Sequence, residues 1–220
     1  MSDGTPERVT AYVDGFNLYF GLRDKGFQRY YWLNIQAMVK NLLRPYQQLV
    51  RTKYFTARIS GPKRTGSSLL ADKIEAKRRR QAIFLEALET LTDFEIYYGH
   101  YLGKLVQCRG CGRDWPDHEE KMTDVNIATE MLADAFRDNF DTALLISADG
   151  DLVPVIGSLK RLFAKKRVIV FFPPERFSAQ LKNVADKQLT IGRGTLARSQ
   201  FPDQVFKTDG NLLKRPEEWR

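Results

Sequence analysis

The stretch Asp141–Ile156 reads DTALLISADGDLVPVI, and the predicted fold is organised around it. Its first half contains a short apolar run at 143–147, which is typical of a buried β-strand. Asp149 and Asp151 follow, separated by one glycine, and an apolar helical pattern begins at Leu152. A buried strand that carries acidic residues at its C-terminal end, just before a helix, marks the position where an open α/β sheet binds its ligand.

Two interpretations of this pair of aspartates are open at this point. Neighbouring carboxylates repel each other, and a shared cation or a raised pKa relieves that repulsion. Alternatively, the pair lies in a solvated turn in which Asp151 caps the following helix. The stretch alone favours neither interpretation.

Strands and helices alternate along the rest of the chain. Short runs of β-branched and aromatic residues predict strands at 9–14, 48–59, 94–98 and 167–172, and helical patterns predict helices that begin at Asn17 and Asn34 and that span 69–91, 124–138, 152–164 and 178–185. This alternation implies an α/β fold with a mostly parallel sheet and helices on both faces. We expect one domain over residues 1–191, with a small cysteine-containing insertion around 100–121, and an irregular C-terminal tail over 192–220, where periodicity is lost.

The composition suits a soluble protein with a polyanionic partner. The 220 residues are 43% hydrophobic and 28% charged, and Lys and Arg exceed Asp and Glu by 35 to 27, a net charge of +8. An excess of basic over acidic residues is compatible with nucleic acid as the partner. We expect no membrane segment and, because the N-terminus lacks an apolar signal region and only two cysteines occur, a cytoplasmic location.

Further acidic residues fall at related positions. Asp14 ends the first strand, and Asp124 lies in the first turn of the helix that precedes the strand at 143–147. In a parallel sheet the ends of these two strands can lie side by side, which would bring Asp14 close to Asp149. Mg²⁺ or Mn²⁺ binds such oxygen ligands, and either ion can activate a water for attack on a phosphate.

Several other chemistries are disfavoured. The only histidines are His100 and His118, which leaves no plausible Ser–His–Asp set or histidine base. The motifs GxxxxGK[ST] and GxGxxG are absent, which weighs against nucleoside triphosphate and dinucleotide chemistry. Water activated by a metal ion is the most economical mechanism that these residues allow.

Three separated motifs resemble those of the NYN domains within the PIN-like nuclease superfamily. They are VDGFN at 13–17, KxxDV at 121–125 and SADGDL at 147–152, and the resemblance covers roughly residues 9–190 in the same order. It implies a Rossmann-like three-layer α/β/α sandwich of the PIN-like type and metal-dependent hydrolysis of RNA, single-stranded in preference to duplex.

The resemblance also implies residue roles. Asp14, Asp124, Asp149 and Asp151 match the acidic Mg²⁺- or Mn²⁺-binding positions, with Asp14 and Asp149 the strongest candidates for direct ligands. Asp124 and Asp151 would bind the metal directly or through water, or position the nucleophile. Ser147 and Asn17 would support the site by hydrogen bonding, although Asn17 can equally be an N-cap of its own helix.

Cys108 and Cys111 form a CxxC motif among glycines, which is the geometry of a zinc knuckle. His118 is a candidate third ligand of a structural Zn²⁺, and His100 would complete a site of two cysteines and two histidines with irregular spacing. A homodimer that shares an all-cysteine site is another route. Because the set of ligands is incomplete, a pair of free thiols in a tight turn remains an open alternative.

Basic residues concentrate at Arg51–Arg64, at Lys73–Arg80 and at Lys160–Arg167, and the run at 77–80 lies on the helix that follows the loop at 61–68. Such a run usually forms a solvated helix face. Together with the loop, however, it can hold a phosphate backbone beside an acidic pocket, and we place Lys63, Arg64 and Arg78 on the RNA-binding side.

The leading hypothesis is therefore a metal-dependent ribonuclease. Two alternatives remain: a non-catalytic RNA-binding or regulatory module with the same fold, and a metal-dependent phosphatase. The first gains nothing from four carboxylates in its RNA groove, and the second usually begins with DxDx[TV], whereas the first strand here ends in DGFN.

Overall fold

The computed structural model describes residues 5–59, 69–107, 110–112 and 114–220, without the side chains of 69–71, 101–107 and 114–120. Six parallel strands form the central sheet in the order β3-β2-β1-β6-β7-β8. They are β1 (Glu7–Asp14), β2 (Gln47–Thr56), β3 (Phe94–Tyr98), β6 (Thr142–Ile146), β7 (Arg167–Phe172) and β8 (Lys187–Thr190). The expected α/β fold with a mostly parallel sheet is confirmed.

The order of the strands fixes the position of the functional edge. From β1 the chain builds outward through β2 to β3, and it then returns to place β6 on the other side of β1. The gap between the C-terminal ends of β1 and β6 is therefore the point where the winding reverses, and ligands of open α/β sheets bind there.

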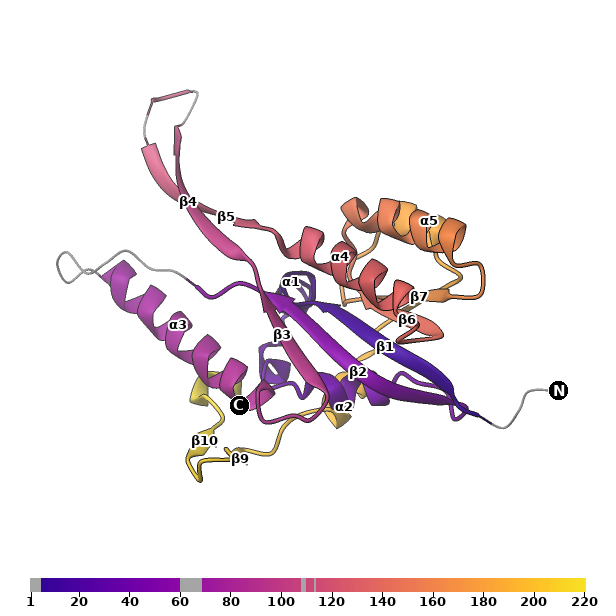
Figure 1. Ribbon diagram of the computed structural model, residues 1–220. Coiled ribbons are helices and arrows are strands. Elements are labelled where there is room, and N and C mark those ends of the chain that lie inside the picture. Colours follow the sequence, from indigo (N-terminus) through magenta and orange to yellow (C-terminus); the bar gives the residue numbers. More distant parts are fainter. Residues whose placement is uncertain (1–4, 60–68, 108–109, 113) are drawn as a thin grey trace.

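Helices cover both faces of the sheet (Figure 1). One layer contains α1 (Gly15–Asp24), α2 (Ile35–Lys40) and α3 (Leu69–Leu88), and the other contains α4 (Thr123–Phe136), α5 (Val153–Leu162) and α6 (Ala179–Val184). Alternate residues of β1 supply the two cores, because successive strand side chains point to opposite faces. Val13 packs with the first layer and Tyr12 with the second.

The segment around the cysteines forms a two-stranded antiparallel hairpin of β4 (His100–Gln107) and β5 (Asp114–Lys121). Figure 1 shows this hairpin projecting away from the sheet. The sequence predicts only a cysteine-containing insertion here, because glycines and polar residues obscure the alternation of the two strands. The hairpin leads directly into α4, so its base lies beside the functional edge.

The C-terminal segment contains more regular structure than its sequence indicates. It forms α7 (Arg193–Arg198), a hairpin of β9 (Gln204–Phe206) and β10 (Leu212–Lys214), and the 3₁₀ turn η3 (Glu217–Trp219). Two other 3₁₀ turns lie earlier in the chain, η1 (Gln28–Tyr30) and η2 (Gly150–Leu152). Leu196 and Phe201 are buried in the core beneath α1–α3. The indole nitrogen of buried Trp32 donates a hydrogen bond to the Pro202 carbonyl at 2.7 Å. Packing against the domain therefore orders a segment that lacks a periodic pattern of its own.

Candidate metal centre

The ends of β1 and β6 meet at the switch point of the sheet. Val13 pairs with Ile146, so the next residues on the two strands, Asp14 and Ser147, lie side by side. The Ser147 hydroxyl donates a hydrogen bond to Asp14 Oδ2 at 2.8 Å. Both residues are buried. The expected approach of the two strand ends is present.

Asp14 uses both carboxylate oxygens inside the protein. It is the N-cap of α1: its Oδ1 accepts from the Asn17 amide at 3.0 Å, and its Oδ2 accepts from Asn17 Nδ2 at 2.7 Å. Asn17 is therefore not a helix cap itself but a donor to the residue that caps its helix. Burial raises the pKa of Asp14, and the charge of Asp149 adds to this, against the opposing effect of the hydrogen bonds from Asn17 and Ser147.

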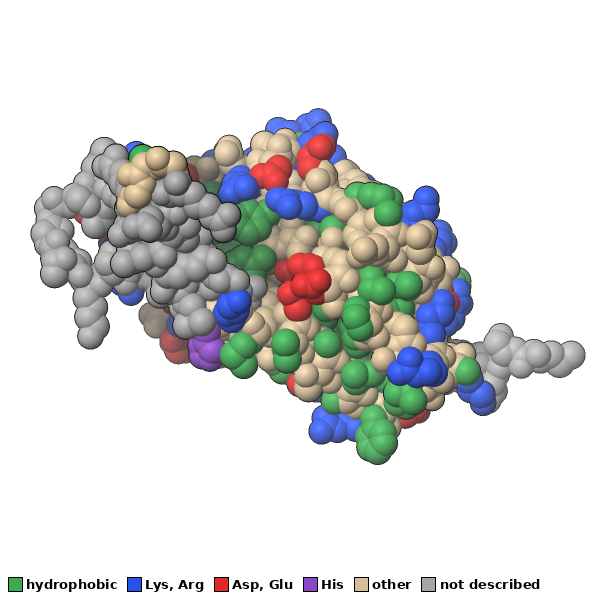
Figure 2. Space-filling model, turned by 90° about the horizontal axis from the view of Figure 1, so that it is seen from above, with side chains coloured by type: hydrophobic (Ala, Val, Ile, Leu, Met, Phe, Trp, Pro, Cys, Tyr) green, Lys and Arg blue, Asp and Glu red, His purple; other side chains and the backbone are tan. Residues whose placement is uncertain are grey.

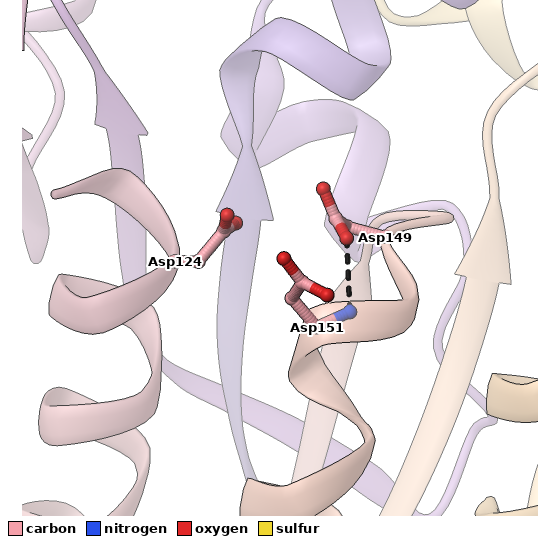
Figure 3. Close-up of side chains that lie close together, drawn as sticks. All are labelled: Asp124, Asp149 and Asp151. Carbon is pink, nitrogen blue, oxygen red and sulfur yellow. Dashed lines mark hydrogen bonds between the residues drawn. The ribbon is translucent and has the colours of Figure 1, made fainter. Parts of the chain in front are cut away.

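Asp149 and Asp151 lie in the turn that follows β6. Ser147 Oγ accepts from the Asp149 amide at 3.0 Å, which ties this turn to Asp14. Asp149 Oδ1 in turn accepts from the Asp151 amide at 2.9 Å and caps η2. The capping role that we considered for Asp151 thus belongs to Asp149, while Asp151 is exposed and its side chain lies beside that of Asp149 (Figure 3).

The third carboxylate comes from the first turn of α4. Figure 3 shows Asp124 facing Asp149 and Asp151 from the neighbouring helix. One carboxylate oxygen of each residue lies within 4.8 Å of the others. α4 begins at Thr123, and its N-cap is Met122, which has a left-handed φ of 81°. That conformation is costly for a residue other than glycine, and it lies where the hairpin turns into the helix.

The arrangement suits a hard divalent cation. Three carboxylates that approach this closely repel one another unless a positive charge or a proton lies between them. Mg²⁺ and Mn²⁺ accept a few carboxylate oxygens and retain water molecules for exchange with substrate oxygens. In the described part of the chain, Asp14 is not a member of the group that approaches within 4.8 Å. It lies behind Asp149, linked to it through Ser147.

Basic and hydrophobic side chains surround the acidic group. Figure 2 shows the acidic patch near the centre of the face, with Lys and Arg side chains around it and a hollow lined by hydrophobic side chains beside it. Lys63 and Arg64 lie outside the described residues. Arg78 is exposed on α3 and pairs with Glu75, with Nε and Oε2 2.9 Å apart. The same helix lines the pocket described below, but Arg78 is not among the lining residues.

The candidate zinc ligands lie in the β4–β5 hairpin. Cys111 is exposed, and Cys108 and the side chain of His118 lie outside the described part. His118 pairs with Gly103, four residues below the Gln107–Asp114 pair nearest the tip, or about 13 Å at the usual rise of a strand. A zinc site that joins His118 to the cysteines would require the tip to fold back, and the zinc hypothesis stays a prediction.

A buried ion network that we did not expect holds α4 on the sheet. Lys53 of β2 has only 4% of its side chain exposed, and its Nζ lies 2.7 Å from both Glu130 and Asp134 of α4. The hydroxyl of Tyr12 donates to Asp134 at 2.6 Å, and the hydroxyl of Tyr97 donates to Glu130 at 2.9 Å. The signal in the sequence was a lysine among buried strand residues and two acids at i and i+4 on the helix that carries Asp124.

Comparison with known proteins agrees with this geometry. The model of the NYN domain family matches residues 8–192. The chain is similar to 6-hydroxy-3-succinoylpyridine 3-monooxygenase HspA of Pseudomonas putida (strain DSM 28022 / S16), at 26% identity over 99% of this chain and 77% of that protein. It is also similar in fold to a protein of unknown function from Vibrio parahaemolyticus RIMD 2210633, with a TM-score of 0.50, 18% identity, and coverage of 88% of this chain and 98% of that one.

Among the described residues, no helix combines the length and the apolar character that a membrane crossing requires. The match covers the switch point, the three approaching aspartates and all six strands of the sheet. The chain therefore belongs to the NYN domain family of PIN-like nucleases.

Proposed function

We propose that this protein is a divalent-metal-dependent ribonuclease that hydrolyses phosphodiester bonds, with single-stranded RNA preferred to duplex. The observation that carries the proposal is the approach of three carboxylates within 4.8 Å at the switch point of an NYN-family sheet. The net charge of +8 supports a polyanionic substrate, because cations around the pocket offset the repulsion between its aspartates and phosphate.

Asp124, Asp149 and Asp151 are the residues that would hold Mg²⁺ or Mn²⁺. When bound, the ion supplies a polarised water and stabilises the negative charge that develops on the scissile phosphate. Asp14 and Asn17 act as positioning residues: together with Ser147 they fix the backbone of Asp149 and hence the direction of its carboxylate. Second-layer contacts of this kind orient metal ligands.

The direct test is cleavage of labelled single-stranded RNA with Mn²⁺ or Mg²⁺. Asp149→Asn keeps an oxygen that can accept from the Asp151 amide, so the turn stays capped while one charge is lost. We expect the wild-type protein to cleave, and Asp149→Asn and an EDTA-treated sample to lose at least about a hundredfold in rate, the order seen when one charge-stabilising group is removed. Asp93→Asn is the matched control, because Asp93 is exposed and has a left-handed φ of 52° that asparagine accepts.

The outcomes separate the three classes of function. Cleavage that persists in excess EDTA or in Asp149→Asn would contradict the proposal. Binding of RNA without turnover under either metal would instead support a non-catalytic RNA-binding module, and release of phosphate from small phosphomonoesters with RNA left intact would support a phosphatase.

The relative from Pseudomonas putida provides a second candidate, action on a substituted pyridine ring. The similarity extends over 99% of this chain. The candidate is tested by following 6-hydroxy-3-succinoylpyridine by mass spectrometry in the presence of dioxygen and a two-electron reductant, which a monooxygenase reaction consumes. An unchanged substrate would exclude this candidate.

A further inference from the structure

A pocket with aromatic walls lies beside the functional edge. It has a volume of about 410 Å³ and is bounded by α1, the end of β2, α3 and the C-terminal turn η3. Seven aromatic rings are among the described lining residues, those of Phe16, Tyr19, Phe20, Tyr31, Tyr54, Phe84 and Trp219. Its volume falls in the range of sites that bind small molecules, and such sites are mostly apolar with a few polar groups.

The rings contact one another and form a continuous surface. The centroids of Tyr19 and Tyr31 are 5.2 Å apart, those of Tyr31 and Trp219 are 5.8 Å apart, and those of Trp219 and Phe84 are 6.2 Å apart. Tyr19 is nonetheless 41% exposed, so the surface is open to solvent. A wall of exposed rings binds the face or edge of another planar ring, because stacking and edge contacts between rings are favourable.

The charged groups that line the pocket are all cationic. They are Arg23, Lys77 and Arg80, and no carboxylate is among the described residues of the lining. Arg23 pairs with Asp24, and Arg80 pairs with Glu218. Lys77 is exposed, and no ion pair is recorded for it among the described residues. The rim is therefore suited to an anionic group attached to the ring.

One polar side chain of the pocket lining, that of Gln81, already has hydrogen-bond partners within the protein. The Gln81 amide donates to the Ala57 carbonyl at 2.9 Å, and its oxygen accepts from the Ile59 amide at 2.8 Å. It is thus unavailable to read the edge of a base. The pocket would distinguish ligands by the presence of a ring and a charge, as stacking platforms for single strands do.

The pocket begins one residue after Asp14. Gly15 lines it, and a Cβ at Gly15 would lie only 2.6 Å from the Tyr54 hydroxyl oxygen and 2.7 Å from the Phe55 carbonyl. The absence of a side chain at Gly15 therefore lets the end of β1 pack tightly on β2, between the pocket and the acidic edge. A ligand that reaches from the pocket to the aspartates passes over this backbone.

We propose that this pocket binds a planar aromatic ring that bears an anionic group, and that its occupant is a nucleotide of single-stranded RNA. The base lies among the rings, its phosphate lies at Lys77, and the chain continues toward Asp124, Asp149 and Asp151. The choice of RNA as occupant rests on the proposed nuclease function. The proposal that the pocket binds an aromatic anion depends only on the residues that line it.

The test measures binding without catalysis. Calorimetric titrations in EDTA use adenosine 5′-monophosphate, a short single-stranded RNA, the same RNA with one abasic position, and nicotinate as a small aromatic acid. Ile74→Trp fills the pocket from a half-buried position on α3, and Lys77→Glu reverses the rim charge. Arg79→Glu makes the same charge change two residues further along α3, at an exposed position outside the lining.

We expect the nucleotide and the RNA to bind the wild-type protein, and Ile74→Trp and Lys77→Glu each to weaken binding by about tenfold, the order expected for loss of one stacked base. The abasic RNA should bind the wild-type protein more weakly by a similar factor, and Arg79→Glu should bind like wild type. Equal weakening by Arg79→Glu, no loss with the abasic RNA, or no binding of the nucleotide would overturn the proposal. Pocket-dependent binding of nicotinate without binding of the nucleotide would overturn RNA as the occupant.

Failure here and failure of the nuclease proposal give different results. If RNA is cleaved but the pocket variants bind it normally, the nuclease proposal stands and the pocket assignment fails. If the nucleotide binds with the expected dependence on Lys77 in both wild type and Asp149→Asn, but no variant cleaves, the pocket assignment stands and the nuclease proposal fails.

Discussion

At the scale of single residues, the hydroxyl of Ser147 joins the buried and exposed halves of the acidic site. It donates to Asp14 at 2.8 Å and accepts from the Asp149 amide at 3.0 Å. The side chain is fully buried, so no water can replace either bond without displacing the turn. The direction of the Asp149 carboxylate therefore depends on a residue that would not contact a metal.

Ser147→Ala removes both bonds. We expect the free energy of unfolding to fall by about 1–3 kcal/mol, the cost of leaving buried partners unpaired. Affinity for Mn²⁺ should fall about 10–100-fold, the usual effect of losing a group that orients a ligand. Denaturant unfolding and Mn²⁺ calorimetry measure the two quantities.

Ser199→Ala is the matched control for this change. Ser199 is also fully buried, donates to the Thr195 carbonyl at 2.7 Å and accepts from Asn41 at 2.9 Å. It should lower stability similarly and leave the affinity for Mn²⁺ unchanged. An equal loss of Mn²⁺ affinity in both variants would mean that Ser147 acts only through stability.

The sequence predicts which site residues lie close together better than it predicts the hydrogen bonds between them. Parallel strand order requires Asp14 and Asp149 to lie at the same sheet edge, and this follows from the sequence. The sequence does not show which carboxylate oxygens of Asp14 remain available to a metal. Their availability depends on hydrogen bonds from the hydroxyl of Ser147 and the side-chain amide of Asn17, whose rotamers are set by packing. For the same reason the capping roles of Asp149 and Asp14 were assigned to their neighbours.

At the scale of elements, α4 is held on the sheet by charge as well as by apolar packing. Lys53 on β2 lies beneath the helix between Glu130 and Asp134, and Ile127 and Met131 fill the apolar contact. Burial alone would raise the pKa of Asp134, but hydrogen bonds from Lys53, Tyr12 and Asn139 outweigh it and keep that pKa below its ordinary value. The network fixes the helix whose first turn carries Asp124.

Lys53→Met leaves the buried Asp134 and the partly exposed Glu130 without their cation. We expect the free energy of unfolding at neutral pH to fall by about 3–5 kcal/mol, the usual cost of breaking a buried pair from one side. Lys160→Met is the control, because the Lys160–Asp186 pair is 41% exposed at the lysine and such pairs contribute about 0–1 kcal/mol. Similar losses in both variants would contradict a structural role for the buried network.

The same network predicts how stability depends on pH. Because the pKa of Asp134 is lowered in the folded state, its ionised form stabilises the protein above the ordinary aspartate value of about 4, and this stabilisation is lost as pH falls through the folded-state pKa. Lys53→Met removes one of the three donors that lower the pKa of Asp134, so the loss of stability on acidification should be smaller. Urea unfolding at a series of acidic pH values measures it.

At the scale of the whole molecule, the C-terminal segment completes one of the two cores. Phe201 is 5% exposed and packs against the ring of Trp32 at a centroid distance of 5.5 Å, whereas Phe206 is 69% exposed. We expect Phe201→Ala to lower the free energy of unfolding by about 3–5 kcal/mol and Phe206→Ala to change it little. Thermal and denaturant unfolding measure both, and a small effect at Phe201 would mean that the segment is only loosely attached.

The sheet could be predicted from sequence because its inner strands are apolar runs bounded by turns. β8 could not, because Lys187–Thr190 is short and polar and is a strand only through its pairing with β7. The β4–β5 hairpin and the C-terminal elements were missed for the same reason: long-range contacts rather than local periodicity determine them.

If Asp124, Asp149 and Asp151 together bind one cation, Mn²⁺ titration calorimetry on the full chain will detect the loss of each carboxylate. We expect wild type and Asp93→Asn to bind Mn²⁺ equally, and Asp124→Asn, Asp149→Asn and Asp151→Asn each to lose more than about tenfold in affinity, or 1.4 kcal/mol. Wild-type affinity in any of these three variants, with the fold intact, would contradict binding of one cation by all three carboxylates.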